Sequence, residues 1–273
     1  MPSLKALRRR LNSVNATLQL SSAMKTVSSV KYSRINKMLA CYEQFTTTET
    51  ELFEPVFHQN DTVSKDEKKI FVLLSGNRGL CGGYNTELFS FFDNVIKGEK
   101  DPIVITCGKK AKEHCEIKKI QTIRHFDMPD IPDYENAQLL VKFLEEAAKD
   151  GFIVCFVYQK HKNLLKREPT TLMVSLNGEN QKEDSSDSFL FLPDKKTVVD
   201  SILPFYHNSK IYSILLNTAA GVQAATLTAM RSAYDTAYDA AQNLLTEINR
   251  KRQSEVTSGV LETRFEEMET FYE

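Results

Sequence analysis

The distribution of glycine and proline most constrains what this 273-residue chain can fold into. Neither residue occurs between Pro2 and Pro55, and neither occurs between Gly221 and Gly259. Eight of the ten glycines lie instead between Gly76 and Gly178. Because these two residue types interrupt helices, the sequence predicts long helices at both ends and a punctuated middle. An all-β or collagen-like chain is excluded.

Residues 3–54 are predicted to form one helix that begins at Ser3 as N-cap. At 1.5 Å per residue, such a helix would be about 78 Å long, which requires a partner helix. Its apolar residues first step by three and four, as in a coiled coil. The spacing then predicts a slip at Ser21–Ala23, after which the seam resumes at Val27 and Val30. The apolar positions expected on the seam are Leu4, Leu7, Leu11, Val14, Leu18, Val27, Val30, Ile35, Met38, Tyr42 and Phe45.

The partner is predicted at the other end of the chain, where the sequence indicates helix from about Ser209. Six residues there repeat the same spacing: Met230, Tyr234, Ala237, Ala241, Leu244 and Ile248. The simplest arrangement is a long antiparallel coiled coil of residues 1–57 with residues 205–273. Gly221 and Gly259 are the places where a kink is expected.

The middle of the chain, residues 68–200, alternates apolar strand-like runs with amphipathic helical segments. Ile70–Leu74, Ile103–Thr106 and Phe152–Tyr158 are expected strands, and Tyr134–Lys149 is an expected helix. Residues 117–126 and 170–176 are also expected to be extended. This alternation predicts an α/β domain, Rossmann-like, with a mainly parallel sheet.

Charge and composition exclude several classes of protein. The net charge is −1, so bulk charge favours neither nucleic acid nor membrane. The longest apolar run has seven residues, Phe152–Tyr158, against about 20 for a membrane span. The five cysteines form no CxxC pair and indicate reduced thiols. No motif for a catalytic or metal site is present, so neither a cofactor nor a metal is expected.

Two features allow more than one interpretation. The cluster Ser75–Asn85 follows a strand and precedes a helix, as a phosphate-binding loop would, but its spacing fits neither GxGxxG nor GxxxxGK[ST]. A tight turn with positive φ is the alternative. Residues 1–42 hold eight cations and no acid, which suits a solvated face, an acidic protein partner, anionic lipid or, least well, nucleic acid.

Three stretches, in order and at matching separations, resemble the gamma subunit of ATP synthase. The first runs from Ser3 to Ser28, and the second, Arg78–Asn85, resembles the signature RGLCGGLN. The third comprises Asn249–Gln253 with Val256-Thr257. Together they span nearly the whole chain.

The resemblance implies a non-catalytic rotor shaft of an F-type ATP synthase, with a coiled coil inside a ring of three alpha and three beta subunits. The α/β domain would be a foot against epsilon and the membrane c-ring, peripheral to the cytoplasmic face of the cell membrane. The implied beta-subunit contacts are Arg8, Arg9, Met24, Lys25, Arg250, Arg252, Gln253 and Thr257. The foot turn would comprise Arg78, Gly79, Leu80, Cys81, Gly82 and Gly83. Nucleic-acid binding and membrane insertion are not implied.

Several positions depart from the family pattern. Ser258 and Gly259 replace the usual Gln-Glu, the tail is acidic, and Asn77 stands where the family has Asp. These departures leave room for a divergent rotary ATPase with another output. A non-rotary coiled-coil scaffold with an α/β head is the second alternative, although such a scaffold would have no reason to keep RGLCGG between two long helices.

Overall fold

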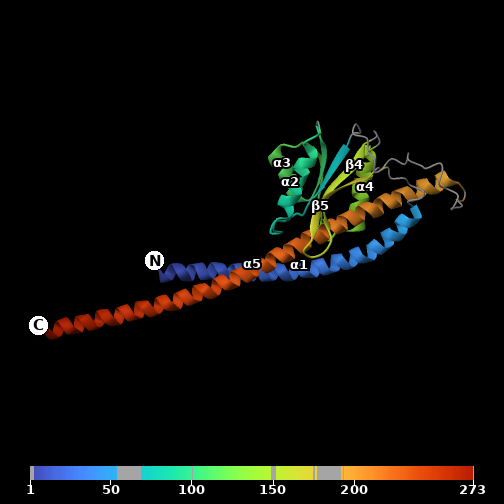
Figure 1. The fold of residues 1–273 in the computed structure, drawn as a ribbon. Coiled ribbons are helices and arrows are strands. Elements are labelled where there is room, and N and C mark those ends of the chain that lie inside the picture. The colour runs from blue at the N-terminus through green and yellow to red at the C-terminus, as the bar shows by residue number, and fades with distance from the viewer. Residues whose placement is uncertain are drawn as a thin grey trace. The chain divides into compact units, whose positions relative to one another are not determined.

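The computed structural model describes residues 3–53, 69–99, 101–148, 152–174, 176, 192 and 194–272. Their contacts divide the chain into two compact units. The first, the helical unit, combines Met1–Thr26 with Ala229–Glu273, and the second, the α/β unit, is Val27–Thr228. The helices α1 (Leu4–Phe53) and α5 (Lys195–Tyr272) each contribute residues to both units (Figure 1).

The helical unit is an antiparallel pair made from the ends of the chain. Leu7 packs against Leu244 and Ile248, while the Lys25 Nζ atom lies 4.5 Å from the ring centre of Tyr234. The partner number falls as the α1 number rises, which defines the antiparallel direction. Small residues at Ala237 and Ala241 are buried in the α5 seam. The Ser3 hydroxyl accepts a hydrogen bond from the Ala6 N–H at 3.2 Å, so Ser3 is the N-cap that the sequence predicted.

The α/β unit is built on a five-stranded sheet of order β3-β2-β1-β4-β5. Its strands are β1 (Lys69–Leu74), β2 (Ile103–Cys107), β3 (Thr122–Phe126), β4 (Ile153–His161) and β5 (Arg167–Val174). The first four are parallel, and only β5, which pairs with β4, is antiparallel. In the centre, Val72 is in register with Ile105 on one side and with Phe156 on the other. The predicted mainly parallel sheet is confirmed.

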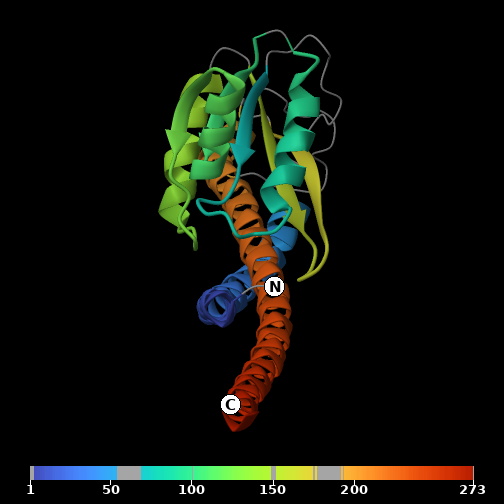
Figure 2. The same cartoon turned by 90° about the vertical axis from the view of Figure 1, so that its left-hand side faces the viewer.

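Helices cover both faces of this sheet, as Figure 2 shows. The helices α2 (Tyr84–Ile96) and α3 (Lys109–Lys118) pack on the face of Phe71 and Leu73. The helix α4 (Tyr134–Ala148) and parts of α1 and α5 pack on the face of Ile70 and Val72. Since both faces are buried, β1 is a continuous apolar run without alternation.

The expected slip in the α1 seam is wrong. Val27 and Val30 are 50% and 67% exposed, whereas Ser21 and Ser28 are buried. The spacing of three and four continues unbroken from Leu18 through Ser21, Lys25, Ser28 and Tyr32 to Ile35, but small or polar residues occupy it. Apolar character therefore did not mark the buried face here.

The predicted starts and ends of several elements also need correction. The helix α5 begins at Lys195, before the predicted Ser209, and contains Pro204. Asp194 caps it, because its carboxylate accepts hydrogen bonds from the N–H and the hydroxyl of Thr197 at 3.0 and 2.7 Å. Residues 117 and 118, expected to be extended, end α3. Helix α5 continues without interruption through Gly221 and Gly259.

Candidate partner-binding surfaces

The C-terminal part of α5 forms a single-helix tip in the helical unit. Because Leu7 pairs with Leu244 and Ile248, the antiparallel register brings the start of α1 beside residues just after Ile248. Every residue from 252 to 261 is exposed, and we call this segment the α5 tip. It exposes apolar side chains at Val256, Val260 and Leu261, by 60%, 59% and 52%. Their exposure marks a surface available to a partner.

Four residues expected to bind a partner lie on or beside this tip. Gln253 and Thr257 are four residues apart, as are Arg252 and Val256, and these four residues line one shallow hollow together with Asn249. The Thr257 hydroxyl donates to the Gln253 carbonyl at 2.9 Å. Arg250 precedes the tip and is exposed. Sequence reasoning missed Val256, Val260 and Leu261, although their apolar character beyond the last paired residue was the available signal.

The expected contacts on α1 divide into free and engaged side chains. Arg8 and Arg9 are exposed next to the buried Leu7. Met24 and Lys25 are half-buried, and the Lys25 ammonium lies over the Tyr234 ring. Lys25 therefore already stabilises the helix pair through a cation–π contact, whereas the arginines present their charge to solvent.

The turn Arg78–Gly83 joins β1 to α2 in the α/β unit. Its backbone has positive φ at Leu80 (63°) and Gly82 (58°), in keeping with a tight turn. Cys81 is buried with Phe71 and Leu88, whereas Leu80 is 56% and the Arg78 side chain 70% exposed. Burial raises the pKa of the Cys81 thiol, which keeps it protonated and unreactive. The turn thus anchors one side chain in the core and exposes its neighbours.

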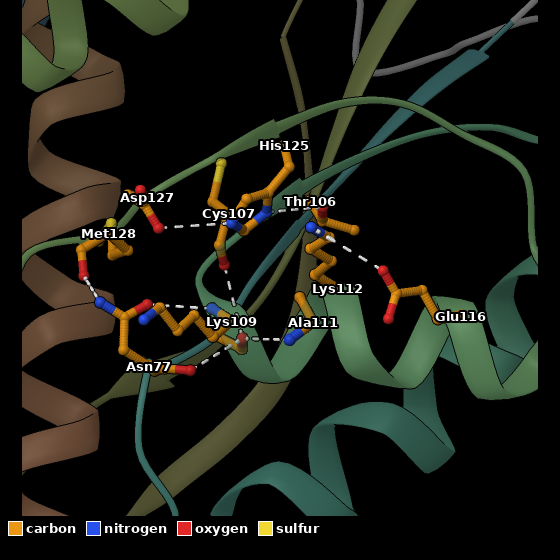
Figure 3. Close-up of polar contacts among 12 residues, drawn as sticks. Asn77, Thr106, Cys107, Lys109, Ala111, Lys112, Glu116, His125, Asp127 and Met128 are labelled. Atoms are coloured by element: carbon orange, nitrogen blue, oxygen red, sulfur yellow. Dashed lines mark hydrogen bonds and ion pairs between the residues drawn. The ribbon is translucent and has the colours of Figure 1, made fainter.

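The N-terminus of α3 lies at the carboxyl edge of the sheet, where doubly wound proteins bind phosphate groups. Its first N–H groups are already used by the segment after β1 (Figure 3). The N–H of Lys109 donates to Asn77 Oδ1 at 3.0 Å and that of Ala111 to Ser75 Oγ at 2.7 Å. The N–H of Lys110 donates to the Gly76 carbonyl at 3.3 Å. A phosphate would have to displace all three acceptors. This geometry argues against phosphate binding at the start of α3, which is not the helix that directly follows the Ser75–Asn85 cluster.

Asn77 also donates through its amide nitrogen to the Met128 carbonyl, so it joins α3 to the segment after β3. We expect Asn77→Asp to lower the free energy of unfolding by about 1–3 kcal/mol, because a carboxylate cannot donate to that carbonyl. Chemical denaturation measures the effect. The exposed Asn94 of α2 supplies the matched control, Asn94→Asp, which should stay within about 0.5 kcal/mol of the unaltered chain. Equal stability of the two variants would contradict this role of Asn77.

The described part of the chain offers little other chemistry. No group of three or more His, Cys, Asp or Glu residues there is arranged to hold a metal ion. None of the described helices is long and apolar enough to cross a bilayer. One ionic contact that sequence reasoning missed joins α1 to the segment after β3: Asp130 pairs with Lys31 and lies 3.6 Å from Arg78.

Comparison with known proteins gives one consistent answer. The sequence model of the ATP synthase family matches residues 3–263. A gamma chain of ATP synthase from Desulfitobacterium hafniense is 26% identical over 275 residues, covering 96% of this chain and 97% of the relative. The corresponding chain of Ruminococcus albus is 28% identical over 288 residues, with 96% of each chain covered.

Solved structures agree at the level of the fold. A chain in the Euglena gracilis mitochondrial ATP synthase, in a structure of OSCP, F1 and c-ring, superposes with a TM-score of 0.72. The match covers 95% of this chain and 91% of that chain at 16% identity. A chain of the rotor of the same enzyme gives a TM-score of 0.67.

Long terminal helices that pair with each other, combined with a doubly wound α/β unit, form the fold that this chain shares with those structures. The family match covers nearly all of this sequence. The chain belongs to the ATP synthase family.

Proposed function

We propose that this chain is the central rotor shaft of an F-type ATP synthase and is itself non-catalytic. It would couple ion flow through a membrane c-ring to ATP synthesis or hydrolysis on a ring of three alpha and three beta subunits. The observation that carries the proposal is the family match over residues 3–263, together with a helix pair that ends in the exposed α5 tip. At the cell membrane, the chain would be peripheral, on the cytoplasmic face.

The α5 tip suits an asymmetric contact inside a ring of subunits. It combines the polar side chains of Arg252, Gln253 and Thr257 with the exposed apolar side chains of Val256 and Val260. In the proposal, beta subunits contact Arg252, Gln253 and Thr257. Arg8, Arg9, Met24, Lys25 and Arg250 supply further contacts, and epsilon and the c-ring bind the α/β unit.

Affinity purification of the tagged chain from its own cells tests the proposal. We expect alpha and beta subunits to co-purify in about threefold excess over this chain, the ratio that a ring around one shaft requires. A one-to-one complex without ATPase subunits would instead support the scaffold alternative. Intact complex bound to a c-ring but lacking ATP synthesis would support a rotary ATPase with another output.

A further inference from the structure

His161, the last residue of β4, is held by both long helices within the α/β unit. Asn217 of α5 binds its backbone: the His161 N–H donates to Asn217 Oδ1 at 2.7 Å, and the Asn217 amide nitrogen donates to the His161 carbonyl at 3.5 Å. The imidazole packs edge-on against the ring of Tyr32 on α1, and its Nε2 atom lies 3.3 Å from the Tyr32 hydroxyl. These three residues, which we call the His161 latch, join the end of β4 to α1 and α5.

The surroundings of the His161 ring suit only its neutral form. His161 is 7% exposed, and among the described residues its Nδ1 atom has no hydrogen-bond partner. In the neutral ring, Nε2 can donate to the Tyr32 hydroxyl and leave only a lone pair at Nδ1. The imidazolium ion has an N–H at both nitrogens, so protonation would bury a charge and a donor without an acceptor, at a cost in free energy. Burial accordingly lowers the pKa of His161.

The sheet around His161 offers no free carboxylate to a protonated ring. The ion pairs of the described histidines involve His114, His125 and His207, and not His161. The charged residues beside His161 on β4 and opposite it on β5 are all cationic: Lys160, Lys162 and Arg167. Glu87 of α2 lies 3.4 Å from Arg167 and is occupied there. Glu168 is likewise paired, 2.6 Å from the ammonium of Lys162.

The two long helices add no free acid. On α1, burial raises the pKa of Tyr32, so its hydroxyl stays neutral beside the imidazole. The adjacent Lys31 is paired with Asp130. Helix α5 has no charged residue from Ile211 to Met230, the stretch that contains Asn217. A protonated His161 would therefore meet only neutral or positive groups from the elements packed against it.

The latch borders an exposed turn, residues 162–166, which connects β4 to β5. The turn is closed by its own hydrogen bonds, from the N–H groups of Lys162 and Asn163 to the Lys166 carbonyl at 3.1 and 3.2 Å. Leu165 in this turn is 73% exposed. Local opening of a protein starts where few buried contacts oppose it, so the end of β4 can open without unfolding the sheet. Opening would bring the His161 ring into water.

We propose that the His161 latch is pH-sensitive: it holds the end of β4 to the two long helices while its ring is neutral and releases it on protonation. In the open form, the ring has the ordinary pKa of histidine, about 6.5. Because the closed form disfavours the proton, the stabilisation is complete above about pH 6.5 and is lost as the pH falls towards the pKa of the closed form. The latch needs no partner subunit, so it is independent of the proposed function.

Hydrogen–deuterium exchange of the full chain at about pH 7.5 and about pH 5.5 tests the latch. After correction for the direct effect of pH on amide exchange, we expect protection of residues 158–162 to fall about tenfold, since about pH 5.5 is one unit below the pKa of the open form. His161→Gln keeps an amide donor that does not titrate, so its protection should be equal at both pH values. His114→Gln is the matched control. His114 pairs with Asp93 at 2.8 Å, so this variant should keep the tenfold response.

Two results would overturn the latch: no loss of protection in the unaltered chain, or the same loss in His161→Gln. If His161→Gln does not fold, NMR of the unaltered chain with labelled histidine decides the question. The signal of His161 is the one displaced by Tyr32→Phe, and we expect it to titrate below the ordinary value of about 6.5. A titration midpoint at or above that value would also contradict the latch.

Discussion

Replacing Gly108 by alanine is expected to lower the free energy of unfolding by about 3 kcal/mol or more. Gly108 has φ of 93°, and a Cβ atom there would lie 2.2 Å from the Ser75 carbonyl oxygen. A strained backbone conformation costs about 1–3 kcal/mol, and forcing an atom into a packed site adds about 1–3 kcal/mol. The carbonyl belongs to the same segment that caps α3, so it cannot move away without breaking those hydrogen bonds. Urea denaturation followed by circular dichroism measures the loss.

Gly98→Ala is the control for this substitution. A Cβ atom at Gly98 meets nothing within 4 Å, so we expect a change within about 0.5 kcal/mol. If Gly108→Ala unfolded at the same urea concentration as Gly98→Ala, the close packing of β1 against the start of α3 would be wrong.

The second large effect is functional, and it is expected from Arg252→Ala/Gln253→Ala on the α5 tip. If these side chains contact the ring, their loss should reduce ATP-driven ion pumping about tenfold or more, because interface arginines often contribute 2 kcal/mol or more. Both residues are exposed and lie beyond the paired seam, so the fold of the helical unit should be unaffected. Uptake of the pumped ion, proton or sodium, into inverted vesicles, alongside ATP hydrolysis, measures coupling.

Lys142→Ala on α4 is the control, since it removes an exposed cation elsewhere. Pumping should then match that of the unaltered enzyme. If the double variant pumped as well as this control, Arg252 and Gln253 would not contact the ring as proposed. The proposal that the chain is the rotor shaft would not be affected, because it is tested separately by assembly of the complex.

The class of fold could be predicted from the sequence because its signals are local. Long stretches without glycine or proline predicted α1 and α5, and the buried apolar run at Ile70–Leu74 predicted β1. The antiparallel pairing of β5 depends on a short connection after His161, which the apolar pattern alone does not report. The early start of α5 was missed: the sequence indicated helix only from about Ser209, whereas Asp194 already caps the helix and Pro204 lies within it.

The buried face of α1 shows where apolar spacing fails. Ser28 is 4% exposed, although the more apolar Val27 and Val30 are 50% and 67% exposed. Gly221 is a similar case: a Cβ atom there would lie 3.3 Å from the Tyr84 ring. The sequence suggested a kink at this glycine. The packing against Tyr84 explains instead why a residue without a side chain occupies this position.

The candidate site was harder to predict than the fold. Arg252 and Gln253 were expected from a resemblance, and they remain proposals, whereas the exposure of Val256 and Leu165 needed the pairing and turn geometry. The exposure of these side chains depends on where the two helices stop pairing and on hydrogen bonds within a turn. Neither can be predicted from the composition or from the spacing of apolar residues.

The burial of the cysteines has a practical consequence for labelling. Cys81, Cys107, Cys115 and Cys155 are buried, and burial raises the pKa of Cys107 and Cys115 to about 12 and that of Cys155 to about 11. Cys41 alone is exposed. A single background change, Cys41→Ser, therefore leaves a chain in which a fluorophore can be attached selectively to a new cysteine at position 165 or 252. Rotation of the chain and its binding to partner subunits could then be followed in one labelled molecule, without removing the buried cysteines.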